Sequence, residues 1–109
     1  MIRLTLVITR KAGTSVEDFR RHYENLHAPL VTRHFPKIAE YKRHYRDVDA
    51  KLDISNQDWD CITESIFENE DDYAAFVTRL QIPEVGEEIF ADGELFMDNS
   101  RTLMFVHSI

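Results

Sequence analysis

His27 is the side chain of this sequence best suited to acid–base chemistry. It stands four residues after Tyr23 and two before Pro29, on or beside the apolar stripe of a helical pattern. A partly buried imidazole, whose unperturbed pKa is about 6.5, can take up a proton and return it near neutral pH. We therefore expect His27 to act as a general acid and base. The alternative is a core or capping histidine that orders the turn into Pro29.

Two tyrosines could stabilise the anion that such a proton transfer creates. Tyr41 and Tyr45 belong to an alternating segment, so both phenols should point to the same side of a strand. A phenol that donates a hydrogen bond to a developing enolate stabilises it as an oxyanion hole does. We expect this role of Tyr41 more than of Tyr45. The alternative is half-buried packing, with the hydroxyl groups at the rim of the core.

An acidic pair interrupts a mostly apolar segment. Asp60 and Glu64 are four apart in an alternating pattern, so both carboxylates should face one side of a strand. Carboxylates are costly there unless they have a partner or a function. In the functional interpretation, one of them orients and charges His27, or serves as a base with a raised pKa. The alternative is a salt bridge to a neighbouring strand. The basic side chains that could form this salt bridge are Arg3, Lys42 and Arg43.

No pattern in the sequence points to a metal or an organic cofactor. Histidines at ligand spacing within one element are absent, and His22 and His27, five apart, should lie on different faces of an α-helix. We expect His22 at the surface. Cys61 has no cation nearby in the sequence that would lower its pKa, so we expect a buried, unreactive thiol. The motifs CxxC, GxGxxG, HExxH and the P-loop do not occur.

Alternating and helical spacing predicts the elements that must position these groups. The predicted strands are residues 1–9, 39–46, 59–67 and 101–107. A first helix begins at a capping box formed by Thr14 and Glu17 and changes at Pro29. A second helix begins at Asn69 and buries a stripe of side chains. The stripe is Tyr73, Phe76, Val77 and Leu80. A short helical or irregular piece follows Pro83.

The resulting order, βαββαβ, is the split βαβ arrangement and predicts an α+β, ferredoxin-like domain. The domain would span residues 1–109, with a four-stranded antiparallel sheet and both helices on one face. Both alternating sets on the first and last strands contain apolar side chains, so the face without helices would expose an apolar surface. Such a surface either promotes aggregation or forms an interface with another protein. We therefore expect a homodimer that pairs through these sheet faces.

Length, charge and cysteine content exclude several classes of protein. The 109 residues suffice for one domain, and 20 acidic against 13 basic side chains give a formal net charge of −7. This charge disfavours binding to nucleic acid and to anionic membranes. No apolar run approaches the roughly 18 residues that cross a bilayer. A single cysteine excludes an intrachain disulfide and suits a reducing compartment, so we expect a cytoplasmic protein.

Residues 10–30, RKAGTSVEDFRRHYENLHAPL, resemble the EthD-like family of the dimeric α/β-barrel superfamily. The resemblance rests on the basic residue and glycine, the capped helix and the HAPL segment, followed by Tyr41 in the second strand. Two later stretches agree: WDCITE at 59–64 and DGELFMD at 92–98, where Gly93 separates an Asp–Glu pair usual in the family. The resemblance implies the ferredoxin-like fold and enzymes that generally use no metal or organic cofactor, although some relatives bind haem. Such enzymes include methylmuconolactone isomerases, polyketide cyclases, and dehydratases or decarboxylases of aromatic polyketide pathways.

Residues and resemblance together predict a cofactor-independent lyase or isomerase that acts on an aromatic, polyketide-like oxo-acid or lactone. His27 would move the proton alpha to a carbonyl, and Tyr41 would hold the enolate oxygen. Asp60 or Glu64 would position the imidazole. Dehydration, decarboxylation and aldol-type cyclisation all pass through such an enolate-like state. The substrate would bind in a cleft between helices and sheet, lined by aromatic side chains. The expected lining is Phe19, Tyr23, Phe67, Phe76 and Phe96.

Two other functions are compatible with the same sequence. A small-molecule-binding accessory protein of a catabolic or biosynthetic pathway would have the cavity without the chemistry. A haem protein would need an axial ligand on the cavity wall.

Overall fold

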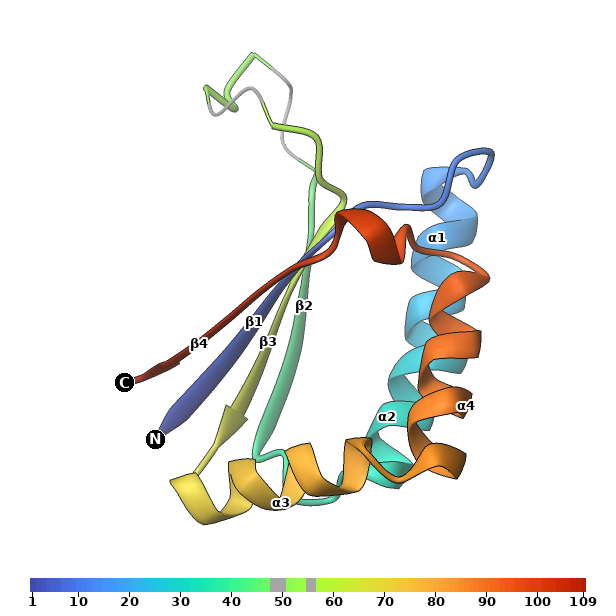
Figure 1. Cartoon of the computed structure of the whole chain (residues 1–109). Helices are drawn as coiled ribbons and strands as arrows, with labels where there is room; N and C mark the ends of the chain where they lie inside the picture. The colour runs from blue at the N-terminus through green and yellow to red at the C-terminus, as the bar shows by residue number, and fades with distance from the viewer. Residues whose placement is uncertain (48–50, 55–56) are drawn as a thin grey trace.

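The computed structural model describes residues 1–47, 51–54 and 57–109, and its chain follows the predicted order βαββαβ (Figure 1). The strands are β1 (Ile2–Ile8), β2 (Glu40–Tyr45), β3 (Cys61–Phe67) and β4 (Leu103–Ser108). The helical segments are α1 (Val16–His22), the π-helical turn η1 (Tyr23–His27), α2 (Ala28–His34), α3 (Glu70–Leu80), α4 (Pro83–Glu94) and the 3₁₀ turn η2 (Asn99–Arg101). The piece after Pro83 is therefore a regular helix. The last strand begins at Leu103, because Arg101 lies in η2.

The four strands form one antiparallel sheet in the order β2-β3-β1-β4, as the ferredoxin-like prediction requires. The helices lie on one side of it: α1, η1 and α2 run alongside α4, and α3 lies across the end where β3 finishes (Figure 1). Alternate side chains of a strand face opposite ways. Leu4 and Ile8 of β1 are therefore buried on the helix side, whereas Arg3 and Val7 face away from the helices.

The first helix begins one residue later than its capping box predicts. Ser15, not Thr14, caps α1, because its Oγ accepts a hydrogen bond from the Asp18 N–H at 3.0 Å. Thr14 instead completes a tight turn, in which its N–H donates to the Lys11 carbonyl and Gly13 adopts a φ of 85°. Glycine adopts this backbone conformation without strain. Because Thr14 belongs to this turn, the helix begins after it, with Ser15 as its N-cap.

The π-turn η1 widens the helix just before Pro29. Proline has no N–H and, in an α-helix, its ring would press against the carbonyl four residues earlier. In η1 the Ala28 N–H bonds to the Tyr23 carbonyl, five residues back, so the chain reaches Pro29 through a wider turn. The change in the helix that was predicted at Pro29 is therefore this π-turn, which contains one residue more than an α-helical turn. This also changes which side chains of the helix share a face.

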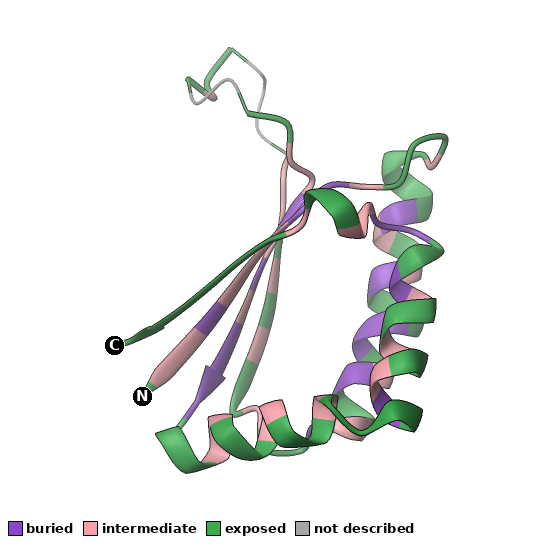
Figure 2. Cartoon of the chain, in the orientation of Figure 1, coloured by how far each residue is buried: buried purple, intermediate pink, exposed green. Residues whose placement is uncertain are grey.

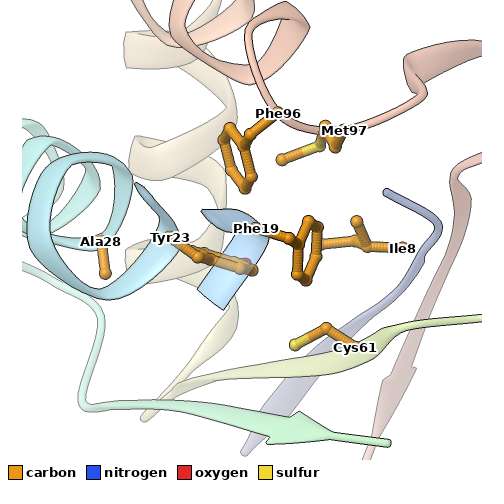
Figure 3. Close-up of a cluster of buried hydrophobic side chains, with 7 residues drawn as sticks. All are labelled: Ile8, Phe19, Tyr23, Ala28, Cys61, Phe96 and Met97. Atoms are coloured by element: carbon orange, nitrogen blue, oxygen red, sulfur yellow. The ribbon is translucent and has the colours of Figure 1, made fainter. Parts of the chain in front are cut away.

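The core gathers where the first helix meets the sheet (Figures 2 and 3). Its main buried cluster is Ile8, Phe19, Tyr23, Ala28, Cys61, Phe96 and Met97. Cys61 is fully buried, as expected, and burial raises the pKa of its thiol to about 11. A second cluster joins α2 to α4 through Val31, Phe35 and Val85. The stripe predicted to be buried on α3 is only half-buried, because its side chains face a cavity.

The sheet face opposite the helices is uncovered in this chain (Figure 1). Every residue of β4 is exposed (Figure 2). Leu103 and Phe105, which pair with Val7 and Thr5 of β1, lie on the uncovered face with 55% and 53% of their surface exposed. The apolar sheet face that the alternating pattern predicts is therefore present. None of the helices in the described ranges combines the length and the apolar composition of a bilayer-spanning segment.

Candidate active site

A cavity of about 430 Å³ lies between the sheet and the helices. All four strands contribute to its wall, together with η1, α2, α3, α4 and η2. Most of the wall is apolar. The polar side chains on it are Tyr23, His27, Tyr41, Ser65, Tyr73, Asn99 and Thr102. A cavity of this size, mainly apolar with a few polar groups, is typical of a site for a small organic molecule.

His27 is held in the cavity wall by a carboxylate from α4. Its Nδ1 lies 2.7 Å from Asp92 Oδ2, and only 7% of its side chain is exposed. Because a carboxylate only accepts hydrogen bonds, Nδ1 carries the proton of the neutral ring, and Nε2 has a free lone pair. Burial lowers the pKa of His27, and the hydrogen bond and charge of Asp92 oppose that decrease. At neutral pH the ring is therefore mostly neutral and can accept a proton at Nε2.

His22 shares the same carboxylate, contrary to its predicted position at the surface. Its Nε2 lies 3.2 Å from both oxygens of Asp92, and its ring stacks on Phe96 at a centroid distance of 4.5 Å. In a regular α-helix His22 and His27 would point in different directions. The π-turn η1 closes its hydrogen bond over five residues, so side chains five apart fall on one face. One carboxylate on α4 can therefore contact both imidazoles.

Two phenols form a short hydrogen-bonded chain in the cavity wall. The Tyr41 hydroxyl donates to the Tyr23 hydroxyl at 3.5 Å, and the Tyr23 hydroxyl lies 2.6 Å from Thr63 Oγ1. Burial raises the pKa of Tyr41 to about 12 and that of Tyr23 well above its ordinary value. Both phenols are therefore protonated at neutral pH and are able to donate. Tyr45 lies outside the cavity wall, and its hydroxyl donates to Glu24 at 2.7 Å.

Neither Asp60 nor Glu64 lies beside His27. Glu64 faces the uncovered side of the sheet, where it lies 3.3 Å from both Arg3 Nε and His44 Nε2. Thr63 and Ser65 on either side of it are buried on the helix face, so the strand's alternation directs Glu64 away from the cavity. The prediction that one of these acids positions His27 is wrong for this chain. The salt bridge to Arg3, weighed as the alternative, is confirmed.

Asp60 precedes β3 and binds the segment that follows β1. Its Oδ2 accepts a hydrogen bond from the Arg10 N–H at 2.8 Å, and its Oδ1 lies 3.2 Å from Arg10 Nε. This carboxylate therefore anchors the chain before the first turn. Sequence spacing did not predict it, because Arg10 lies outside the neighbouring strands from which partners were expected.

The five aromatic residues expected to line the cavity divide into two groups. Tyr23 and Phe76 are on its wall. Phe19, Phe67 and Phe96 are fully buried in the core behind it. Phe96 packs against the His27 ring at 5.1 Å, so it supports the imidazole rather than contacting a ligand. Phe67 lies beneath Phe76, at 5.1 Å between ring centroids.

The family model of the EthD domain matches residues 11–100. The chain belongs to the EthD domain family. The match covers His22, His27, Tyr41 and Asp92, so the candidate acid–base groups lie within the family domain. The family resemblance inferred from the HAPL segment is thereby confirmed.

Curated relatives of this EthD-domain chain carry enzyme names. It is 30% identical to Decarboxylase nsrE of Aspergillus novofumigatus, over 94% of this chain and 74% of the relative. It is 29% identical to Decarboxylase claH of Passalora fulva, over 94% of this chain and 72% of the relative. It is 26% identical to Dehydratase ustZ of Ustilaginoidea virens, over 97% of this chain and 81% of the relative.

Solved structures share its fold at low sequence identity. An EthD-like protein from Ralstonia eutropha matches with a TM-score of 0.71 and 14% identity, over 98% of this chain and 89% of that one. A dimeric protein of unknown function from Bacteroides fragilis, described as having a ferredoxin-like fold, matches with a TM-score of 0.62 and 10% identity. That match covers 99% of this chain and 95% of the other. The ferredoxin-like fold is therefore confirmed for this EthD-domain chain.

Three residues of the site were not predicted from the sequence: Asp92, His22 and Asn99. Asp92 begins the DGELFMD stretch that resembles the family, and this was the available signal for it. His22 required knowledge of the π-turn, and nothing in the sequence distinguishes Asn99. Among the described residues, His, Cys, Asp and Glu side chains nowhere form a group of three arranged to hold a metal ion.

Proposed function

We propose that this EthD-domain protein is a cofactor-independent lyase that decarboxylates an aromatic or polyketide-like oxo-acid, with His27 as its general acid. The observation that carries the proposal is the His27–Asp92 pair, at 2.7 Å, on the wall of a largely apolar cavity. The names of two relatives, both decarboxylases, support the reaction type. Cys61, a free buried thiol, is compatible with the cytoplasmic location that we also propose.

In this reaction the bond between the carboxylate carbon and the substrate breaks, and carbon dioxide leaves. The bonding electron pair moves toward the neighbouring carbonyl and forms an enolate. The phenol of Tyr41 is protonated because burial raises its pKa to about 12. Its O–H turns from the Tyr23 hydroxyl, 3.5 Å away, and donates a hydrogen bond to the enolate oxygen. The His27 imidazolium then gives its Nε2 proton to the carbon that lost the carboxylate. Asp92 stabilises the imidazolium through Nδ1, and His27 regains one proton from solvent in each turnover.

Dehydration is the second candidate, and one observation favours it. Burial lowers the pKa of His27, so the neutral ring predominates at neutral pH and can act as a base. As a base, Nε2 would remove the proton alpha to a carbonyl, and hydroxide would leave from the next carbon. The proton that His27 received would complete the leaving water. The name of one relative, a dehydratase, agrees with this reaction.

The test compares His27→Gln with His44→Gln. His44 is exposed on the opposite face of the sheet, so its variant controls for the loss of an imidazole. Both variants are incubated with a panel of aromatic oxo-acids and hydroxy-acids, and products are identified by mass. Because general acid–base catalysis contributes typically 10²–10⁴-fold, we expect a loss of about that size in His27→Gln only.

Loss of carbon dioxide identifies the decarboxylase, and loss of water identifies the dehydratase. Equal turnover in His27→Gln and the wild type would contradict the proposed role of His27. Binding without turnover in any of the proteins would instead favour the accessory protein. A Soret band in the purified protein would favour the haem alternative.

We also propose that a second copy of the chain covers the apolar sheet face. The Bacteroides fragilis neighbour and a ferredoxin-like protein from Thermobifida fusca are both described as dimeric, which supports the proposal. Leu103 and Phe105 on this face are each more than half exposed in a single chain, so a partner would remove substantial apolar surface from water.

A further inference from the structure

The side-chain nitrogen of Asn99, a half-buried residue, is itself buried and has no hydrogen-bond partner. Asn99 is the first residue of η2 and lies on the cavity wall. In the described part of the chain, two buried side-chain nitrogens lack a hydrogen bond: Arg3 Nε and Asn99 Nδ2. Arg3 Nε is still 3.3 Å from Glu64, so its charge is paired. Asn99 Nδ2 has no such partner, and a buried amide without one is costly.

Two other polar groups of the cavity wall are already engaged. Thr102 Oγ1 donates to the Asp98 carbonyl at 3.2 Å, and the Tyr23 hydroxyl is bound to Thr63. The turn η2 also forms without the Asn99 side chain, because Asp98 Oδ1 accepts from the Ser100 N–H at 3.1 Å and the Asn99 backbone carbonyl accepts from the Thr102 N–H. The Asn99 amide therefore has no evident part in building the turn.

Gly93 places this amide close to the acid–base pair. Asp92 of α4 holds His27, and the next residue, Gly93, contacts Asn99: a methyl group added at Gly93 would lie 3.5 Å from Asn99 Oδ1 and 3.8 Å from Nδ2. His27, Gly93 and Asn99 all lie on the wall of the same cavity. Asp92 and Gly93, consecutive residues of α4, therefore lie beside His27 and Asn99, respectively.

We propose that Asn99 orients the substrate by turning its side-chain amide toward the cavity and donating a hydrogen bond from Nδ2 to a carbonyl or phenolate oxygen of the bound molecule. That oxygen remains on the product, so the contact fixes which carbon faces His27 Nε2. The inference rests on the proposed function for the identity of the reaction. It predicts a ligand with an acceptor oxygen on an otherwise apolar ring system, because the rest of the wall offers mainly apolar contacts.

The first test is the stability of the ligand-free protein. Asn99→Leu replaces the amide with an apolar group of similar size. We expect an unchanged or higher Tm, because the variant removes an unpaired donor and breaks no hydrogen bond. Asp98→Ala is the control from the same turn and should lower the Tm, because Asp98 caps η2. A fall in Asn99→Leu as large as that in Asp98→Ala would overturn the inference, since Asn99 would then be structural.

The second test is a pair of ligands that differ in one oxygen. Wild-type protein labelled with ¹⁵N is titrated with 1-tetralone and with tetralin, which lacks the carbonyl. We expect tetralone to bind more tightly and to shift the Asn99 side-chain amide signals. In Asn99→Leu the preference for tetralone should fall by about 3- to 10-fold, the value of one neutral hydrogen bond. In Asn99→Asp it should fall at least as much, because a carboxylate cannot donate.

Three results would overturn the inference. They are an undiminished preference for tetralone in Asn99→Leu, a stronger preference in Asn99→Asp, and no binding of either ligand to the wild type. The proposed function fails separately: if His27→Gln retains turnover while Asn99→Leu loses the tetralone preference, the acid–base role is wrong and the orienting role of Asn99 stands. For the true substrate, Asn99→Gln should restore part of the rate lost in Asn99→Leu.

Discussion

At the scale of single residues, the proposed chemistry depends on one carboxylate that two imidazoles share. Asp92 is 2.7 Å from His27 and 3.2 Å from His22, and the two rings pack against the same phenylalanine. For His27, burial favours the neutral ring, whereas Asp92 favours the charged one. The balance between these effects decides how much imidazolium is present at a given pH. It can be changed by a single substitution.

Asp92→Asn should lower the pKa of His27 further. The substitution removes the charge that opposes the effect of burial, while the burial itself remains. It also places a neutral amide beside Nδ1, and the NH₂ of that amide can donate to Nδ1 and leave the ring proton on Nε2, so we expect turnover to fall by about 100-fold or more. The measurement is the NMR titration of the His27 ring together with kcat. Asp18→Asn, at an exposed helix position, is the control, and an unmoved His27 pKa in Asp92→Asn would contradict the assignment.

The pH dependence of kcat should distinguish the two candidate reactions. Decarboxylation requires the His27 imidazolium, whose fraction falls as pH rises through the pKa. Because burial lowers that pKa from the ordinary 6.5, the fall of kcat should have its midpoint below 6.5. Dehydration requires the neutral ring, so its kcat should rise over the same interval and level off above it. A kcat independent of pH between about 4 and 8 would exclude His27 from the rate-limiting proton transfer.

At the scale of elements, the first helix shows how a local backbone change creates the site. The π-turn η1 lets Pro29 follow directly and brings His22 and His27 to one face. The start of this helix is equally specific, because Ser15 rather than Thr14 satisfies the first free N–H groups. The Ser15 cap sets where the helix begins, and η1 sets where it widens. The positions of His22 and His27 depend on both features.

Ser15→Ala should destabilise the protein, and Thr14→Ala should do so much less. Ser15 Oγ accepts from Asp18 N–H at the start of α1, and loss of such a cap costs about 1 kcal/mol. Thr14 contributes backbone groups to its turn, which alanine retains. Urea unfolding of the two variants measures the difference. The reverse order of stabilities would mean that the capping box begins at Thr14 after all.

Strands and helices could be predicted from the sequence where their apolar residues follow one regular spacing, every second residue in a strand or 3.6 residues per turn in an α-helix. Alternation identified all four strands, and Asn69 was correctly taken as the cap of α3, where it accepts from Asp72 N–H at 2.8 Å. The His22 position was missed because spacing arguments assume 3.6 residues per turn, which η1 violates. Asp92 was missed because its contact with His27 spans 65 residues and depends on how α4 packs. Glu64 was assigned to the site because strand alternation alone does not say which face is covered.

At the scale of the whole molecule, one face of the sheet builds the cavity and the other has no cover. The helix face carries the small and polar residues Thr63 and Ser65 of β3 next to Leu4 of β1. The uncovered face carries Leu103 and Phe105, with the Arg3–Glu64–His44 cluster beside them. An apolar patch bordered by paired charges is typical of an interface between proteins. A second copy would meet it with the same residues, as a two-fold axis requires.

Phe105→Glu should convert the dimer into a monomer. A carboxylate on the apolar face would lose its hydration in the interface without gaining a partner. Leu26→Glu is a matched control, because Leu26 is similarly exposed, at 57% against 53%, but lies on the helix surface. Light scattering after size exclusion should give twice the chain mass for the wild type and Leu26→Glu, and the single mass for Phe105→Glu. A wild-type protein that is already monomeric at micromolar concentration would contradict the proposed dimer. A dimer that persists in Phe105→Glu would place the interface elsewhere.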